Sequence, residues 1–265
     1  MIEDSHFLRE TVVDIDAAVV GIGNSRWTAL LESEATEQLA MKIMEEQRFD
    51  TLPVESGSGI KEYYQTVNWN DYSSITRHTL THRDVVPFKT SLRNVIRGFA
   101  SESRHFYFLS NERRVVGLIT VANLNCRQVK IYLFSLVSEL EIRLGRFVSK
   151  RCEDGELLEM TFGNSDNPKY AVVKKKYHSN KSTGVDLPFV EYLYLSDLVK
   201  VIAKKRLFGE LGFESKNQFY AVFNPLITLR NDSAHPNNSI VTDADSCQKL
   251  WKNIDQVEQL LFELR

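Results

Sequence analysis

The sequence predicts two parts of different fold class, an α/β part over residues 1–127 and an all-α part over residues 128–265. A helix–strand–turn–strand order occurs twice in the first part, which is typical of an internal repeat. From residue 128 onward, apolar residues recur at helical spacing with charged residues between them. The length of 265 residues fits one or two domains, and 43% hydrophobic residues can form a core.

Each repeat has its own predicted elements. The first is expected to form a helix over 33–48, strands over 49–54 and 60–67 around a Gly-Ser-Gly turn, and a second helix that opens at the polar segment 68–72. The second is expected to form a helix over 91–101, strands over 105–109 and 115–120, and a helix that begins at residue 122. This order predicts two α/β units related by a pseudo-two-fold axis.

The second part is predicted to be a bundle of four or five helices. The expected helices cover 131–148, 193–207, 226–234 and 243–264, and the polar stretch 152–186 is expected to form loops or an exposed insertion. Asn224-Pro225 predicts the start of the third helix, since Asn is a favoured N-cap and Pro a favoured first helical residue. His235-Pro236 predicts its end, because a residue before proline is disfavoured in a helix.

The composition restricts the class of protein. Three scattered cysteines without CxxC spacing predict free thiols in place of a disulfide framework or a zinc site. No apolar stretch approaches the ~18 residues of a membrane span, and the acidic, polar start MIEDSHFLRE is unlike a secretory signal. We therefore expect a soluble, cytoplasmic protein. The net charge of −2 does not by itself predict nucleic-acid binding.

Residues 33–126 resemble a tandem pair of CBS repeats, the Bateman module, through "RFDTLPV" at 48–54 and "VVGLITVANL" at 115–124. The family signature Gly-hydrophobic-x-Ser/Thr-x-x-Asp has Thr120 in the second repeat, with Asn123 in place of the acid. The first repeat has Asp71, with Asn68 in place of the hydroxyl. The resemblance implies an adenine nucleotide (AMP, ADP or ATP) as a regulatory ligand. The implied binding residues are Asn68, Asp71, Thr120 and Asn123, with backbone groups of Pro53, Val54 and Leu109.

The same residues have a simpler interpretation from their chemistry alone. Thr, Asn and Asp are favoured helix N-caps, so they are equally compatible with a purely structural role. Nearby cations, Arg77, His78, His82 and Arg83, are compatible either with phosphate contacts or with a solvated surface.

"PLITLRNDSAHP" at 225–236 resembles the HEPN family of helical domains, whose motif is an Arg, commonly a polar residue after it, and a His four to six residues later. Arg230, Asn231 and His235 match this pattern. The resemblance covers residues 128–265 and implies a metal-independent cleavage of RNA by dimers whose two motifs face one another. It also implies a homodimer as the functional state.

The chemistry of the motif agrees with this resemblance. Arg230 supplies a permanent charge with donors suited to phosphate oxygens, and the unperturbed pKa of a histidine such as His235 suits proton transfer near neutral pH. RNA carries its own nucleophile, the 2′-hydroxyl, so a base and a cation are sufficient. The alternative is structural: Arg230 pairs with Asp232 or Glu141, Asn231 caps the helix, and His235 is an ordinary surface residue.

Two functions follow as hypotheses. The first is a nucleotide-regulated, metal-independent endoribonuclease of the toxin or defence type, acting as a homodimer on RNA. The second is a catalytically silent adenine-nucleotide sensor whose helical part is a dimerisation or interaction scaffold. Basic side chains in the second part are candidate contacts to an RNA backbone: Lys174, Lys175, Lys176, Lys200, Lys204, Lys205 and Arg206.

Overall fold

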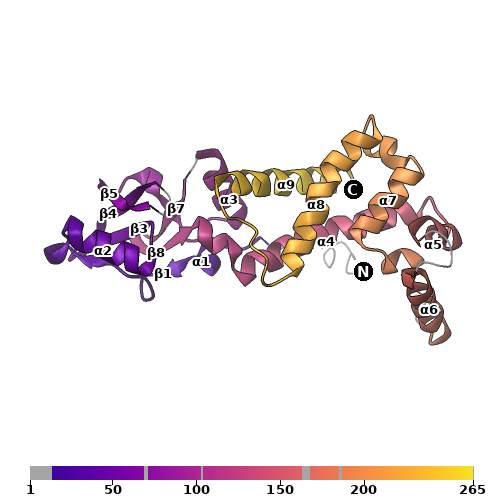
Figure 1. Cartoon of the computed structure of the whole chain (residues 1–265), viewed down its shortest axis with the longest axis horizontal. Coiled ribbons are helices and arrows are strands. Elements are labelled where there is room, and N and C mark those ends of the chain that lie inside the picture. The colour runs from indigo at the N-terminus through magenta and orange to yellow at the C-terminus, as the bar shows by residue number, and fades with distance from the viewer. Residues whose placement is uncertain (1–13, 69–70, 103, 163–167, 185–186, 265) are drawn as a thin grey trace, which may run out of the picture. The chain divides into compact units, whose positions relative to one another are not determined.

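A computed structural model describes residues 14–68, 71–102, 104–162, 168–184 and 187–264 (Figure 1). The mixed α/β class is confirmed, since the described residues contain two four-stranded sheets together with many helices. The described chain divides into two compact units. One, here called the N-terminal unit, combines Asp14–Val129 with Val241–Gln248. The other, the helical unit, combines Lys130–Ile240 with the end of the chain from Lys249.

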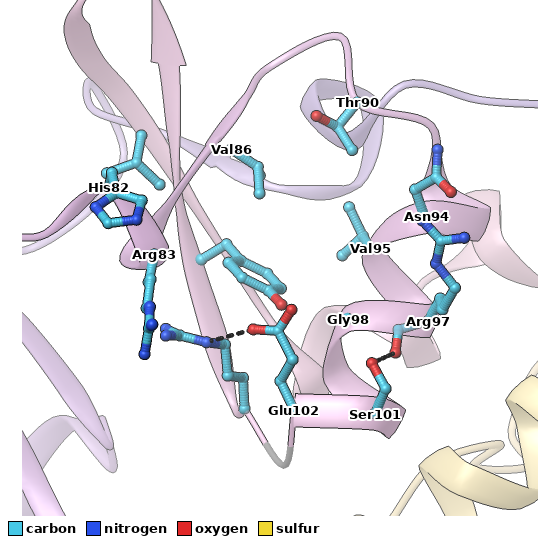
Figure 2. Close-up of a pocket in the computed structure, with 13 residues that line it drawn as sticks. His82, Arg83, Val86, Thr90, Asn94, Val95, Arg97, Gly98, Ser101 and Glu102 are labelled. Carbon is cyan, nitrogen blue, oxygen red and sulfur yellow. Dashed lines mark hydrogen bonds and ion pairs between the residues drawn. The ribbon is translucent and has the colours of Figure 1, made fainter.

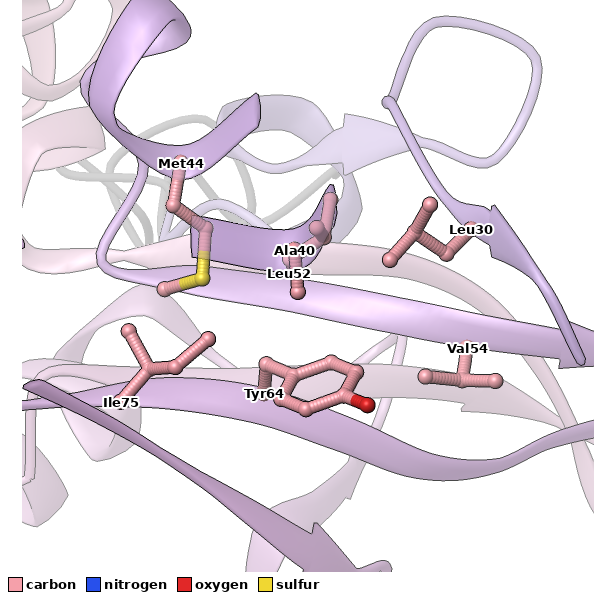
Figure 3. Close-up of a cluster of buried hydrophobic side chains, with 7 residues drawn as sticks. All are labelled: Leu30, Ala40, Met44, Leu52, Val54, Tyr64 and Ile75. Atoms are coloured by element: carbon pink, nitrogen blue, oxygen red, sulfur yellow. The ribbon is translucent and has the colours of Figure 1, made fainter. Parts of the chain in front are cut away.

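The first sheet of the N-terminal unit has the strand order β2-β3-β4-β5. Its elements are β2 (Leu30–Leu31), η2 (Glu32–Glu34), α2 (Glu37–Gln47), β3 (Thr51–Ser56), β4 (Gly59–Asn68) and β5 (Asp71–Thr79). Thr36 starts α2 by accepting a hydrogen bond from the Leu39 amide at 3.3 Å, and Arg48 ends it in the left-handed conformation. A buried cluster joins α2 to the sheet (Figure 3): Leu30, Ala40, Met44, Leu52, Val54, Tyr64 and Ile75.

The predicted helix after residue 68 is wrong. The chain instead reverses and forms β5, which pairs antiparallel with β4 and brings Asn68 opposite Asp71. The segment Asp71–Thr79 contains Ile75 with two serines before it and two threonines after it, a composition that fits a pleated strand. Its buried Ile75 completes the cluster on the sheet, so packing favours the strand. Trp69 and Asn70 lie outside the described residues.

The second sheet repeats the arrangement with the order β1-β8-β7-β6. Its elements are α1 (Ala17–Val20), β1 (Ile22–Gly23), η3 (His82–Asp84), β6 (Val85–Pro87), α3 (Leu92–Glu102), β7 (Phe106–Asn111), β8 (Arg114–Thr120) and η4 (Val121–Asn125). In each sheet a short strand runs parallel to the strand after the helix, β2 with β3 and β6 with β7. The predicted helix and both strands of the second repeat are therefore confirmed within a few residues.

The helical unit is built from α4 (Arg127–Ser149), α5 (Asp154–Phe162), α6 (Pro168–Ser182), η5 (Phe189–Tyr192), α7 (Leu195–Lys204), η6 (Leu207–Leu211), α8 (Lys216–Ala234) and α9 (Ala244–Glu263). The first residues of α4 and α9 belong to the N-terminal unit. The expectation of loops over 152–186 is wrong where the structure describes this stretch, because α5 and α6 are helices. Tyr177 of α6 packs on Phe189 and donates a hydrogen bond to Asp154, contacts that sequence periodicity does not reveal.

Helix α8 starts earlier than predicted. Ser215 is its N-cap and accepts a hydrogen bond from the Gln218 amide at 3.2 Å, so Pro225 lies inside the helix and not at its first position. The predicted end is confirmed, since α8 stops at Ala234 and His235 adopts φ −102° and ψ 118°. All three cysteines are free thiols. Among the described residues, no helix is both long enough and apolar enough to cross a membrane.

Candidate functional site

The N-terminal unit contains a cavity of about 280 Å³ between its two repeats, close to the lower limit of ~300 Å³ for small-molecule pockets. The start of β3 contributes Pro53, and the end of β8 with η4 contributes Thr120 and Asn123. Three of the residues predicted to bind a nucleotide therefore line one cavity. The other lining residues are Ile22, Arg26, Trp27, Thr28, Arg48, Phe49, Asp50, Thr51, His105, Leu118, Val121 and Ala122.

Thr120 and Asn123 are joined by two hydrogen bonds at the start of η4. The Thr120 backbone amide donates to Asn123 Oδ1 at 2.8 Å, and the Thr120 hydroxyl donates to the same oxygen at 3.0 Å. The capping interaction that residue chemistry suggests is therefore present. It engages the carbonyl oxygen of the Asn123 side chain, and the amide nitrogen of that side chain is a donor for hydroxyl or phosphate oxygens.

Cationic and aromatic side chains complete this cavity. Arg26 and Arg48 are exposed guanidinium groups at its border, and Trp27 is half-buried in its wall. The Trp27 ring meets Phe108 edge-on, with centroids 6.3 Å apart and planes at 87°. An aromatic wall beside two arginines is suited to a ligand with a flat base and an anionic group.

The other predicted binding residues are not among those lining this cavity. Val54 and Leu109 are buried, at 2% and 3% exposure, and serve the hydrophobic core. Asn68 and Asp71 face each other at the β4–β5 hairpin, where the Asn68 amide donates to Asp71 Oδ2 at 3.3 Å. Hydrogen bonds from Ser73, through its hydroxyl and its backbone amide, hold the pKa of Asp71 below its ordinary value. This pair joins the end of β4 to the start of β5.

A Thr-x-x-Asp group that the sequence analysis missed lies at Thr81–Asp84. The Thr81 amide and hydroxyl donate to Asp84 Oδ2 at 2.8 and 2.7 Å, the same geometry as Thr120 and Asn123. Arg104 donates to the other Asp84 oxygen at 2.8 Å. Burial raises the pKa of Asp84, but hydrogen bonds from Thr81 and Arg104 outweigh it, so the pKa is below its ordinary value. The spacing of three residues between Thr81 and Asp84, identical to that between Thr120 and Asn123, is the sequence feature that could have predicted this group.

In the helical unit, the guanidinium of Arg230 projects from α8 into a cluster of groups on α4 and at the start of α7. Its carbon lies 5.5 Å from the Phe134 ring centre and 5.0 Å from that of Tyr194, within cation–π range. Its Nε lies 3.5 Å from Glu141 Oε2, and neither atom has a hydrogen-bond partner among the described residues. The Arg230 side chain is 21% exposed.

Glu141 has an unusual environment for a carboxylate. Burial raises its pKa above the ordinary value, and the charge of Arg230 and the Leu195 backbone amide act in the opposite direction without cancelling that effect. Of the two pairing partners considered for Arg230 from sequence, Glu141 is the one that the structure places beside it. Asp232 instead accepts a hydrogen bond from the Asn238 side chain at 2.9 Å.

His235 is exposed just beyond α8, and Asn231 is exposed within its last turn. The loop that carries His235 is held by Lys130, which is buried to 6% exposure. Its ammonium group donates to the backbone oxygens of His235, Pro236 and Asn238 at 3.1, 2.6 and 2.5 Å. The backbone at His235 is therefore anchored, and the imidazole faces solvent.

The basic side chains are distributed unevenly. Lys174, Lys175 and Lys176 are exposed on α6, whereas Lys205 forms an ion pair with Glu156 and Lys200 one with Asp197 at 3.5 Å. Acidic side chains therefore offset part of the second cluster, and Lys176 on α6 lies over the Tyr192 ring at 5.9 Å.

Comparison with known proteins adds no relative. No family model matches this chain, and no curated protein matches it. Within the described residues, no group of three or more His, Cys, Asp or Glu is arranged to hold a metal ion.

Proposed function

We propose that this chain is a nucleotide sensor whose N-terminal unit binds an adenine nucleotide in the cavity between its repeats. The observation that carries the proposal is the convergence of Thr120, Asn123 and Pro53 on one cavity together with Arg26 and Trp27. In this cavity a phosphate of the nucleotide would bind the Arg26 guanidinium, and the base would lie against the Trp27 indole. The side-chain amide of Asn123 would donate a hydrogen bond to a ribose hydroxyl.

Binding is tested by titrating the full chain with AMP, ADP and ATP and recording tryptophan fluorescence and melting temperature. Ligand at a hundredfold excess over Kd is expected to stabilise the fold by about 2.7 kcal/mol. Trp27→Phe should abolish the fluorescence change while leaving a thermal shift, because Trp27 lines the cavity.

Two variants link binding to this cavity. Arg26→Ala should weaken nucleotide binding about tenfold or more through loss of a charge-assisted contact. The matched control Arg114→Ala removes an exposed arginine outside the cavity and should leave affinity unchanged. Equal affinity of Arg26→Ala and wild type, or no thermal shift with any of the three nucleotides, would reject the site.

A second candidate function is metal-independent cleavage of RNA by Arg230 and His235. The observations that favour it are the partly exposed Arg230 side chain, at 21% exposure, and the exposed position of His235 just beyond α8. In this mechanism His235 takes the proton of the ribose 2′-hydroxyl, which attacks the adjacent phosphorus, and the expelled 5′-oxygen takes up a proton from water. Arg230 stabilises the charge on the phosphate oxygens, and the product ends in a 2′,3′-cyclic phosphate.

The assay is incubation of single-stranded RNA with the protein in EDTA. His235→Ala should reduce the rate by about 10²–10⁴-fold, Arg230→Ala should lose most activity, and Asn231→Ala should lose less. Asn237→Ala, an exposed change in the same loop, is the control and should keep full activity. DNA should survive, since it lacks the 2′-hydroxyl. Wild-type activity in His235→Ala would reject His235 as the base. A wild-type protein that cleaves no RNA would reject this second function, and nucleotide sensing would remain as the proposed function.

We further propose that the cleaving form is a homodimer in which the two motifs face one another. The exposed apolar side chains Ile131, Phe134 and Ile142 on α4 support this, at 54%, 36% and 46% exposure. Light scattering should give twice the chain mass, and Ile131→Glu with Ile142→Glu should give monomers without RNA cleavage. A wild-type monomer at micromolar concentration would contradict the composite site.

A further inference from the structure

A second cavity in the N-terminal unit, of about 730 Å³, lies outside the site proposed above (Figure 2). Its residues come from η3 and β6 on one side, from α3 on the other and from β7. It shares no lining residue with the cavity at Thr120 and Asn123. Its volume lies within the ~300–1,000 Å³ range of small-molecule sites.

Two arginines stand on opposite walls of this cavity. Figure 2 shows Arg83 on the side of η3, beside His82, and Arg97 on the side of α3, beside Asn94. Both arginines are exposed, and neither has an ion-pair partner among the residues that the structure describes. A guanidinium without a counter-ion is a ready donor to phosphate oxygens.

The third arginine of the cavity is neutralised by its neighbours. Arg104 donates to Asp84 at 2.8 Å and to Glu102 at 2.9 Å. Among the described residues that line the cavity, Glu102 is the one carboxylate, and it shares the single positive charge of Arg104 with Asp84, so these three groups together carry a net charge of −1. Arg83 and Arg97 outweigh this charge and leave a net charge of +1 around the cavity, which favours anions.

The floor of the cavity is apolar and tightly built. Val86, Val95 and the Tyr107 ring lie there, and Gly98 allows the phenol to approach α3, because a Cβ at Gly98 would collide with the Tyr107 hydroxyl. Burial raises the pKa of Tyr107 to about 12, so the hydroxyl stays protonated. Tyr107 therefore carries no negative charge at neutral pH that would repel an anion.

We propose that this cavity is a second ligand site, for an elongated small molecule with two or more phosphate groups that Arg83 and Arg97 hold from opposite walls. The site is independent of the nucleotide site at Thr120 and Asn123. It would give the unit a response to a polyphosphorylated compound separate from its response to adenine nucleotide.

The test is calorimetric titration of the full chain with inorganic tripolyphosphate, which has no base or sugar for the first cavity to recognise. We expect saturable binding that weakens with added NaCl. The double variant Arg83→Ala/Arg97→Ala should lose at least about tenfold in affinity, since two charge-assisted contacts are removed. The control Lys61→Ala/Arg114→Ala removes two exposed cations away from the cavity and should bind like wild type.

Three outcomes would overturn the proposal: no saturable binding by wild type, equal loss in both double variants, or loss in Asn123→Ala equal to that in the arginine variant. The last would place tripolyphosphate in the first cavity. AMP titration separates this failure from a failure of the nucleotide proposal, because Arg83→Ala/Arg97→Ala should leave AMP binding unchanged. All four cations are exposed, so their removal should not disturb folding, and circular dichroism checks this.

Discussion

Arg230 is held where two aromatic rings and one carboxylate meet. The ion pair with Glu141 is 3.5 Å long and lacks a hydrogen bond, so it leaves donor capacity on the guanidinium and acceptor capacity on the carboxylate. A partly buried pair of this kind adds little to stability, because desolvation offsets the Coulomb attraction. Both unsatisfied atoms, Arg230 Nε and Glu141 Oε2, are buried, so the pair is a local cost within the helical unit.

Glu141→Gln tests the environment of this carboxylate. The folded pKa of Glu141 is raised above its ordinary value of 4.5, so its contribution to stability is full below that value and is lost as pH rises through the folded pKa. The melting temperature of Glu141→Gln should therefore rise relative to wild type between pH 4.5 and pH 7. If the difference in melting temperature between Glu141→Gln and wild type stayed constant or fell over this pH range, the raised pKa of Glu141 would be contradicted.

Lys130→Met tests the anchor beneath His235. The change removes a buried ammonium that donates to three backbone oxygens, and we expect a loss of about 1–3 kcal/mol in the free energy of unfolding. Urea denaturation measures the loss. Lys252→Met, an exposed lysine on α9, should change stability by less than about 0.5 kcal/mol. If both variants unfold alike, Lys130 does not support the loop.

At the scale of elements, α8 shows how a breaker residue is tolerated. Pro225 lies inside the helix, yet Ser215 caps its start and Phe219, Phe223, Leu226 and Leu229 bury one face. Proline at an interior position removes one backbone donor and crowds the preceding turn. Burial of four large apolar side chains, each contributing roughly 1.5–3 kcal/mol, exceeds this cost of about 3 kcal/mol.

Pro225→Ala should therefore stabilise the protein. Pro225 is exposed, so its replacement loses no core packing, and the restored amide can complete the helix. We expect a gain of about 1–2 kcal/mol in urea denaturation, after allowance for the greater freedom of the unfolded chain. Asn224→Ala, which changes helix propensity alone at the neighbouring exposed position, should gain about 0.5 kcal/mol. A destabilised Pro225→Ala would show that the helix needs the distortion.

At the scale of the whole molecule, the chain returns to its first unit near its end. Asn125, at the end of η4, donates to the Val241 backbone oxygen at 2.6 Å and accepts from the Val241 amide at 3.0 Å. Val241 and Cys247 are buried, at 3% and 2% exposure. The segment Val241–Gln248 thereby becomes part of the N-terminal unit although most of its sequence neighbours belong to the helical unit.

Asn125→Ala should lower the free energy of unfolding by about 1–3 kcal/mol, because two partly buried backbone groups of Val241 lose their partner. Proteolysis should also cut the segment before residue 244 sooner in this variant. Asn237→Ala, an exposed asparagine, is the control and should melt like wild type. An Asn125→Ala protein with wild-type stability would mean that packing of Val241 and Cys247 alone holds the segment.

Local sequence determined most of the elements. Helices α2, α3, α4, α7 and α9 follow from apolar spacing and caps, β3, β4, β7 and β8 from short apolar runs between turns, and the end of α8 from Pro236. Residue type also indicated Thr120 and Asn123 at a strand end. The pairing of a CBS-like module with a HEPN-like domain, and the roles of Arg230, Asn231 and His235, stay predictions.

Tertiary structure decided what local pattern could not. Strand β5 replaces the expected helix because Ile75 completes a core formed by residues distant in sequence. The Tyr177 side chain of α6 packs against Phe189, a contact that local pattern does not predict. Arg230 of α8 lies beside Glu141 of α4, and not beside Asp232 of its own helix, because the fold brings these two helices together at this point. The cation-lined cavity at Arg83 and Arg97 has no local signature at all. Such features arise from contacts between distant segments, whose free energy exceeds intrinsic preferences of less than about 1 kcal/mol per residue.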